Sequence, residues 1–256
     1  MPALKLSKWY LDRVTDAGDV SIVYTGAAHW GVVQLHYSSL LESTGSVVTS
    51  QHSLREQDEP VQEGDCIRWQ SKALGVEGEW QSNPAPLHET IYSSAEGSIE
   101  WHCLMPQAKT RFRDRHGLGY AEHIAMTIAP WKLPIETLLW GRFTSAQDSV
   151  VWIDWQGEAA RRMVFMNGKA VSGAEMDDDH IEFPGGSRLT MDRSLVLREG
   201  ALGSTALSVI PGIRKIFPAR LLQVNECKWR SRARLQLPGK PAVEGWAIHE
   251  RVSWPK

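Results

Sequence analysis

The stretch Gly117–Gly157, GLGYAEHIAMTIAPWKLPIETLLWGRFTSAQDSVVWIDWQG, decides how the fold of this chain is interpreted. Apolar and polar side chains alternate with period two through much of it, which predicts β-strands. The stretch also holds four of the twelve tryptophans of the protein, namely Trp131, Trp140, Trp152 and Trp155. We therefore expect strands that place aromatic side chains beside a few ionisable groups, an environment that raises the pKa of a carboxyl group.

The same kind of pattern continues outside this stretch. Strand-like segments recur at short spacing, and the connections between them carry glycine, proline, asparagine or aspartate. This arrangement is typical of a β-sandwich or β-barrel. The best helix candidate, Pro134–Trp140, is short. Because the polar run Pro106–Gly119 suggests a join, we expect an all-β fold of two halves, residues 1–108 and 109–256, with very little helix.

Composition excludes several classes of function. A formal net charge of −2 gives no general electrostatic basis for nucleic-acid binding. The sequence has no apolar run long enough for a membrane-spanning helix and no signal-peptide pattern at its start. Three widely spaced cysteines indicate reduced thiols, so we expect a cytoplasmic protein. The basic run Arg214–Arg234 fits a strand with one solvated face better than a phosphate- or membrane-binding patch.

Motifs of several common catalytic chemistries are absent from the sequence. It contains no GxSxG, GxxxxGK[ST], GxGxxG or HExxH motif, and its nine histidines never fall at HxH or HxxxH spacing. The acidic run in Asp177–Gly186 lacks the spaced oxygen ligands of a calcium loop. We therefore expect neither a bound metal nor a cofactor.

Strand phase identifies three carboxyl groups on apolar strand faces. Glu122 shares a face with Ile124 and Met126, Asp154 shares one with Trp152, and Glu250 shares one with Trp246 and Ile248. An inward carboxylate must be ion-paired, hydrogen-bonded or protonated. Each of the three is therefore either a structural group, for example one paired with Arg142, or a general acid that protonates a double bond.

Other candidates lie near these carboxyl groups in the sequence or at a possible barrel mouth. His123 follows Glu122 directly, so it points to the opposite face of the same strand. His29 and Trp30 interrupt a strand-like run with small residues, a feature expected at a barrel mouth. We expect a pocket for a hydrophobic small molecule whose walls include Trp131, Trp140 and Trp152.

Several segments together resemble one protein family. The opening KWYLDRVTDAGDVSIVYTG, the central GYAEH, and the later WGRF, VVWIDW and VEGWAIHERV are similar to segments of the hydroxyneurosporene synthase (carotenoid hydratase) and AttH-like family, in the same order. The resemblance spans Trp9 to Val252. It implies two tandem lipocalin-like halves and a hydrophobic substrate that is hydrated, isomerised or cyclised.

The resemblance also implies roles for individual residues. Glu122 of GYAEH becomes the first choice for the acid, with Tyr120 and His123 nearby, and Asp154 and Glu250 follow. The sequence departs from the hydratases at Ala121 and Glu122, where they tend to carry tryptophan and aspartate. The resemblance therefore implies an acid-assisted pocket rather than a carotenoid substrate. Two alternatives stay open at this point: a carrier that binds an apolar ligand without chemistry, and an interaction partner whose tryptophans only fill two cores.

Overall fold

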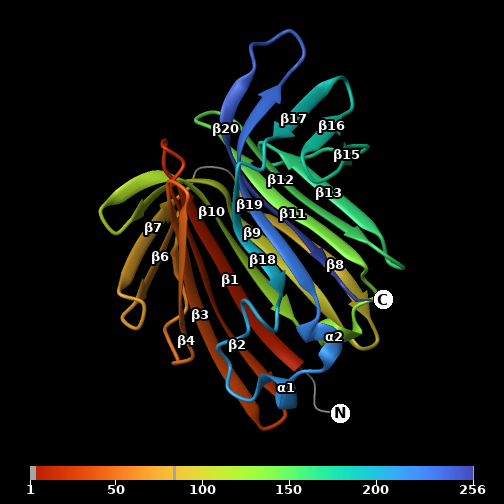
Figure 1. The fold of residues 1–256 in the computed structure, drawn as a ribbon. Coiled ribbons are helices and arrows are strands. Elements are labelled where there is room, and N and C mark those ends of the chain that lie inside the picture. Colours follow the sequence, from red (N-terminus) through yellow and green to blue (C-terminus); the bar gives the residue numbers. More distant parts are fainter. Residues whose placement is uncertain (1–3, 83–84, 256) are drawn as a thin grey trace. The chain divides into compact units, whose positions relative to one another are not determined.

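The computed structural model describes residues 4–82 and 85–255 (Figure 1). Almost all of its regular structure is antiparallel β-sheet, and the chain folds as two compact units that meet in the sequence between Lys132 and Leu133. Each unit is built on a curled ten-stranded sheet. The prediction of an all-β chain with two lipocalin-like halves is confirmed.

The first unit has the strand order β4-β3-β2-β1-β10-β9-β7-β6-β5, and β8 also pairs with β9. Its strands are β1 (Leu4–Val14), β2 (Val20–Trp30), β3 (Val33–Thr44), β4 (Val47–Ser53), β5 (Val61–Glu63), β6 (Cys66–Ser71), β7 (Val76–Gln81), β8 (Leu87–Ser94), β9 (Gly97–Phe112) and β10 (Arg115–Met126). Neighbouring strands in this order are sequential in the chain except for the pairs β1–β10 and β7–β9, and the pairing of β1 with β10 brings distant segments together.

The second unit repeats this order strand for strand, as β14-β13-β12-β11-β20-β19-β17-β16-β15, with β18 on β19. Its strands are β11 (Thr137–Thr144), β12 (Ser149–Gln156), β13 (Arg161–Met166), β14 (Lys169–Ala170), β15 (Glu175–Met176), β16 (His180–Phe183), β17 (Ser187–Met191), β18 (Leu195–Ala201), β19 (Asn225–Gln236) and β20 (Val243–Ser253). Strand β11 thus corresponds to β1, β20 to β10 and β19 to β9, so the chain is a tandem repeat of one topology.

The boundary between the compact units lies beyond the join expected at residues 108 and 109. Residues 106–119 belong to the hairpin of β9 and β10. Their polarity has a local cause, because Lys109 and Arg111 are exposed on β9 while Thr110 and Phe112 between them are buried. Alternation along one strand therefore accounts for the polar run.

The expected helix at Pro134–Trp140 is wrong. A single 3₁₀ turn, η1, covers Pro130–Lys132, and strand β11 begins at Thr137 because that residue pairs with both β12 and β20. Two short α-helices, α1 (Ile213–Ile216) and α2 (Ala219–Leu222), lie in the connection from β18 to β19. The expectation of very little helix is met.

One face of each sheet, here called the inner face, carries the hydrophobic core of its unit. In the first unit the buried cluster comprises Trp9, Leu11, Val23, Leu40, Ile67, Trp69, Leu74, Val76, Trp80, Met105, Ala108, Phe112 and Ala121. Because side chains alternate along a strand, the residues between these, such as Tyr10 on β1, lie on the opposite, outer face. Trp69 and Trp80 are therefore core residues.

The core of the second unit is built in the same way around Trp152, Phe143 and Leu189. Gly141 on β11 is required there, because a Cβ atom at this position would overlap the ring of Trp152 and crowd His249. The tryptophan fills the volume that a side chain at residue 141 would need. Trp152, expected in a pocket wall, is part of a packed core instead.

Candidate functional site

Glu122 and Glu250 lie on corresponding strands of the two units, β10 and β20. Glu122 on β10 is paired in register with Tyr10 on β1, and Glu250 on β20 is paired with Trp140 on β11. Both glutamates lie on the outer face of their sheet, since their neighbours Ala121 and His249 lie on the inner one. The repeat therefore offers two carboxyl groups for comparison.

In the first unit Glu122 is held by two neutral donors. Its Oε2 atom accepts hydrogen bonds from the Tyr120 hydroxyl and the Trp101 indole N–H, each at 2.6 Å. Burial raises the pKa of Tyr120 well above its usual value, and Cys103 and Glu122 beside it raise it further. Tyr120 therefore keeps its proton and donates a hydrogen bond to Glu122. A carboxylate formed at this position is stabilised by two hydrogen bonds within the unit.

A second buried carboxyl group lies beside this one on the same face. Asp12 on β1 is paired with Tyr120 in register, and its Oδ2 atom accepts a hydrogen bond of 2.9 Å from the Tyr10 hydroxyl. The ring of Tyr10 meets that of Tyr120 edge-on, with centroids 5.9 Å apart. Sequence reasoning missed Asp12. The available signal was its spacing of two residues from Tyr10, which places both on one face.

Asp154 forms an ion pair inside the second unit. Its two carboxylate oxygens accept hydrogen bonds of 2.9 and 3.2 Å from the Nε and Nη2 atoms of Arg162, which lies opposite it in register. The Gln156 amide adds a third hydrogen bond, of 2.8 Å. Asp154 is therefore a structural carboxylate, as the alternative in the sequence allowed, but its partner is Arg162. Arg142 instead donates to the Thr144 hydroxyl and the Trp246 carbonyl.

Glu250 differs from Glu122 in the charge of its partner. The Nζ atom of Lys228, whose side chain is 1% exposed, donates directly to Glu250 and lies 3.7 Å from Glu226. The ammonium group also lies over the Trp140 ring, 5.3 Å from its centroid. A buried ammonium is stabilised by an ionised partner, so this contact favours the carboxylate form of Glu250 over the proton-donating form.

His123 points away from Glu122, as strand phase predicts, and lies on the inner face of the first unit. Its Nε2 atom is 2.9 Å from the Ser7 hydroxyl, which in turn donates to Glu59 at 3.1 Å. The Trp9 ring is 4.8 Å from the His123 ring between centroids. Burial lowers the pKa of His123, Glu59 opposes this shift, and His102 adds to it. The result is a neutral imidazole hydrogen-bonded to a hydroxyl group.

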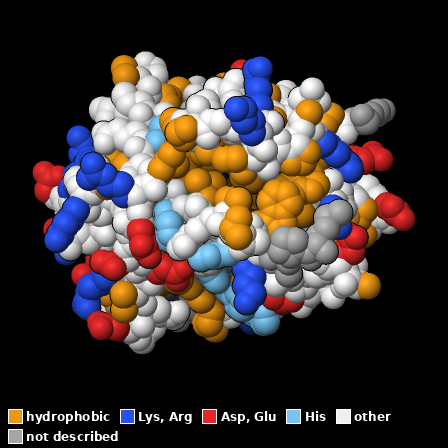
Figure 2. All heavy atoms as spheres, turned by 90° about the horizontal axis from the view of Figure 1, so that it is seen from below, with side chains coloured by type: hydrophobic (Ala, Val, Ile, Leu, Met, Phe, Trp, Pro, Cys, Tyr) orange, Lys and Arg blue, Asp and Glu red, His pale blue; other side chains and the backbone are white. Residues whose placement is uncertain are grey.

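His123 belongs to a group of five histidines on this inner face, which we call the histidine band. Cross-strand register places His88, His102 and His123 side by side on β8, β9 and β10, while His29 and His36 lie on β2 and β3. The rings of His88 and His102 are stacked, with centroids 4.2 Å apart. Figure 2 shows histidine side chains in a row on the face viewed from below. Only His29 and His123 were expected from the sequence.

A cavity of about 330 Å³ opens beside the histidine band. Two of its walls come from β2 and β3, and the third comes from the connection between β4 and β5. Its lining is mostly polar and includes His29, His36, Tyr37, Arg55 and Glu59. His29 thus lines this cavity. The polar lining differs from the aromatic walls that the sequence suggested.

The remaining predicted aromatic residues lie in three places. The rings of Trp30 and Trp131 contact each other in the first unit, with centroids 5.1 Å apart. Trp140 lies on the outer face of the second unit with Lys228, whereas Trp152 is in the core. Within the first unit the structure therefore brings Tyr120 and Glu122 together, and it leaves His123 on the other face of their sheet.

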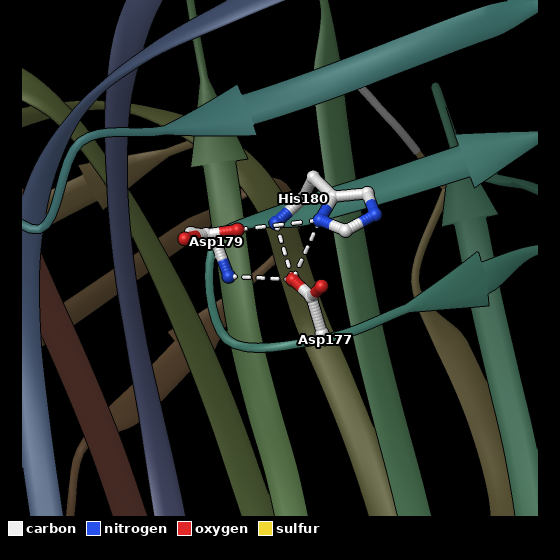
Figure 3. A group of neighbouring side chains, drawn as sticks. All are labelled: Asp177, Asp179 and His180. Atoms are coloured by element: carbon white, nitrogen blue, oxygen red, sulfur yellow. Dashed lines mark hydrogen bonds and ion pairs between the residues drawn. The ribbon is translucent and has the colours of Figure 1, made fainter.

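The acidic run at 177–180 forms a compact turn. Asp177 Oδ1 accepts hydrogen bonds from the backbone N–H groups of Asp179 and His180, and it lies 2.7 Å from the His180 ring nitrogen (Figure 3). These bonds satisfy the carboxylate within the turn. Hydrogen bonding inside the loop accounts for the grouping of Asp177, Asp179 and His180 without a ligand.

Comparisons with known proteins identify the fold. No protein-family model matches the sequence, and no curated protein sequence matches it. Among solved structures, CghA in complex with Sch210972 matches with a TM-score of 0.55 and 10% identity, over 98% of this chain and 88% of CghA. NE1406 of Nitrosomonas europaea, described as an AttH protein, matches with a TM-score of 0.54 and 8% identity, over 96% of this chain and 92% of that one.

A third match is kievitone hydratase from Nectria haematococca, with a TM-score of 0.50 and 10% identity, over 100% of this chain and 90% of the hydratase. At such low identity, these similarities establish that this chain shares the fold of CghA, NE1406 and kievitone hydratase. The AttH-like resemblance seen in the sequence agrees with that fold. Among the described residues, no helix is both long enough and apolar enough to cross a membrane.

Proposed function

We propose that this chain is an enzyme in which Glu122 protonates a double bond of a hydrophobic small molecule. The observation that carries the proposal is the contrast between two carboxyl groups on corresponding strands. Tyr120 and Trp101 present neutral hydrogen-bond donors to Glu122, whereas Lys228 presents a positive charge to Glu250. Neutral donors stabilise the carboxylate after proton transfer without enforcing ionisation beforehand.

The proposed reaction begins with proton transfer from the Glu122 carboxyl group to one alkene carbon. The O–H bond breaks, a C–H bond forms, and the other alkene carbon becomes cationic. Aromatic rings near the site, such as those of Tyr120 and Trp101, stabilise the cation. Water then adds to the cation and returns a proton to the carboxylate, so the net change is the addition of one water molecule.

Hydration is favoured among the three reaction types expected from the sequence, because kievitone hydratase shares the fold and is named for hydration. Isomerisation and cyclisation begin with the same protonation and differ in how the cation is consumed. CghA, which has the same fold, was crystallised with Sch210972, and this supports a small organic molecule as the class of ligand. For this chain both points are inferences from fold neighbours.

The proposal is tested first by identifying the ligand. Native mass spectrometry of the purified protein, followed by solvent extraction, is expected to reveal a co-purifying apolar compound. Incubation of that compound, or of kievitone as a probe, with the enzyme in isotope-labelled water should place one labelled oxygen in the product. Tight binding of the apolar compound with no chemical change over long incubation would identify a carrier instead.

A further inference from the structure

The two units differ in the connection that precedes β9 in one and β19 in the other. In the first unit β8 and β9 are joined by the turn Ala95–Glu96. In the second unit the corresponding connection runs from Leu202 to Val224 and contains both α1 and α2. We call residues 202–224 the insertion segment. Since the first unit closes the same topology with a short turn, the fold does not require this segment.

The insertion segment is built onto the ends of its two strands. The Leu202 N–H donates to the Val224 carbonyl at 2.8 Å, and the Gly203 N–H donates to the Leu222 carbonyl at 3.0 Å. Ile210, Leu221 and Val224 are buried beneath it. These contacts anchor the segment and give it a small core of its own, so that its remaining side chains project from a fixed base.

The charge of the insertion segment is one-sided. It contains three basic residues, Arg214, Lys215 and Arg220, and no aspartate or glutamate, although the whole chain has a formal net charge of −2. Arg214 and Lys215 are exposed. Within the part of the chain that the structure describes, neither of these two forms an ion pair. A charged residue without an acidic neighbour is free to meet an anionic partner.

Apolar side chains share the surface with these basic residues. Val209 is 36% exposed, and Ile213, Ile216 and Phe217 are only partly buried around Arg214 and Lys215. The segment thus combines positive charge and accessible apolar area.

We propose that the insertion segment docks on the surface of an anionic lipid bilayer. Arg214, Lys215 and Arg220 then face the lipid headgroups, and Val209, Ile213 and Phe217 enter the interfacial region. Positive charge and exposed apolar side chains on one short segment are the two features that bind proteins to such surfaces without crossing them. An acidic protein would neutralise the charges but does not by itself account for the exposed apolar residues. The proposal does not depend on the role of Glu122.

Vesicle sedimentation tests the proposal on the full chain. We expect the protein to sediment with vesicles of phosphatidylcholine and phosphatidylserine, to stay in solution with phosphatidylcholine alone, and to be released as salt is raised, because exposed charges are screened. The R214Q/K215Q variant should bind the anionic vesicles about 25-fold more weakly, at about fivefold for each basic residue. The apolar variant I213S/F217S should also bind more weakly.

The matched control is K169Q/K240Q, which removes two exposed lysines of the same unit outside the insertion segment. Its net charge equals that of R214Q/K215Q, so unchanged vesicle binding in this control shows that the segment, rather than overall charge, is responsible. Circular dichroism and thermal unfolding verify that each variant is folded. The proposal is overturned if the wild-type chain does not sediment with anionic vesicles. That result is expected if the partner of the segment is an acidic protein. Equal weakening of R214Q/K215Q and K169Q/K240Q also overturns it.

Discussion

Lys228 occupies in the second unit the register position that Cys103 occupies in the first. Cys103 on β9 is paired with Glu122, and Lys228 on β19 is paired with Glu250. A neutral thiol beside one glutamate thus corresponds to an ammonium group beside the other. Burial raises the pKa of Cys103 well above its usual value, so the thiol keeps its proton. This difference places an ammonium group beside Glu250, whereas the Cys103 thiol beside Glu122 is neutral.

Replacement of Lys228 by methionine should destabilise the protein strongly. The change leaves the half-buried Glu250 without its cation, whereas Glu226 keeps Arg198 at 3.6 Å, and breaking a buried ion pair in this way costs about 3–5 kcal/mol. Urea unfolding monitored by tryptophan fluorescence measures the loss. Combining Lys228→Met with Glu250→Gln should restore part of the lost free energy of unfolding, since the charge left without a partner is then removed. A double variant no more stable than Lys228→Met would show that the pair is not the cause.

Tyr120→Phe should lower the free energy of unfolding by about 1–3 kcal/mol, because a buried hydrogen-bonding group, Glu122, loses one of its donors. Trp101→Phe removes the other donor and should have a cost in the same range, together with a loss of packing. Urea unfolding of the two single variants and of the double variant measures the coupling. Strict additivity would mean that the two donors do not act on a common carboxyl group.

Stability should decrease as the pH falls below the ordinary pKa of histidine, and His249 is a main cause. Burial lowers the pKa of His249 from 6.5 to about 3, and the positive charges of Arg193 and Lys228 contribute to the shift. Above pH 6.5 the group is neutral in both states and has no effect. Below it the unfolded chain binds a proton that the folded chain does not, so stability falls progressively toward the lower pKa.

At about pH 5 this effect of His249 amounts to about 2 kcal/mol. His249→Gln removes the titration and offers a side-chain group for the Ser231 hydroxyl, which lies 2.7 Å from the ring nitrogen. Thermal unfolding between neutral and mildly acidic pH should therefore show a shallower pH dependence in the variant. The lowered pKa values of His102 and His123 act in the same direction in both proteins. Identical pH profiles would contradict the burial of a neutral His249.

Gly141→Ala should destabilise the second unit by about 1–3 kcal/mol, because the added methyl group overlaps the Trp152 ring in a filled core. The companion change Trp152→Phe provides space and should reduce the cost of the alanine. Thermal unfolding of the single and double variants tests this compensation. If the alanine costs the same in both backgrounds, the close approach of Gly141 and Trp152 does not determine the packing.

Sequence reasoning identified the strand faces of this protein better than the partners of its side chains. Period-two alternation correctly separated Glu122 from His123, because successive side chains on a strand point to opposite faces whatever the sheet contains. It could not identify Arg162 as the partner of Asp154, since that requires the register between β12 and β13. The histidine band was missed for the same reason, because its five members come from five strands.

The tandem repeat was also invisible in the sequence, although the resemblance to a two-half family suggested it. Equivalent positions hold chemically different residues, such as Tyr10 and Trp140 or Cys103 and Lys228. Only the strand order and the register show that these positions correspond. Glu122 and Glu250 carry the same residue type on corresponding strands, but their partners differ.

The activity of Glu122→Gln compared with that of Glu250→Gln tests the central claim most directly. Glu122→Gln replaces a buried carboxyl group and Glu250→Gln a half-buried one. Because Glu250→Gln also removes a partner of the buried Lys228 ammonium, thermal unfolding is used to verify that each variant is folded before activities are compared. Turnover of the co-purifying compound, or of kievitone, is measured with ligand binding determined in parallel. We predict that Glu122→Gln lowers turnover by about 10²–10⁴-fold with ligand affinity retained, and that folded Glu250→Gln stays active. Full turnover in Glu122→Gln would contradict the account.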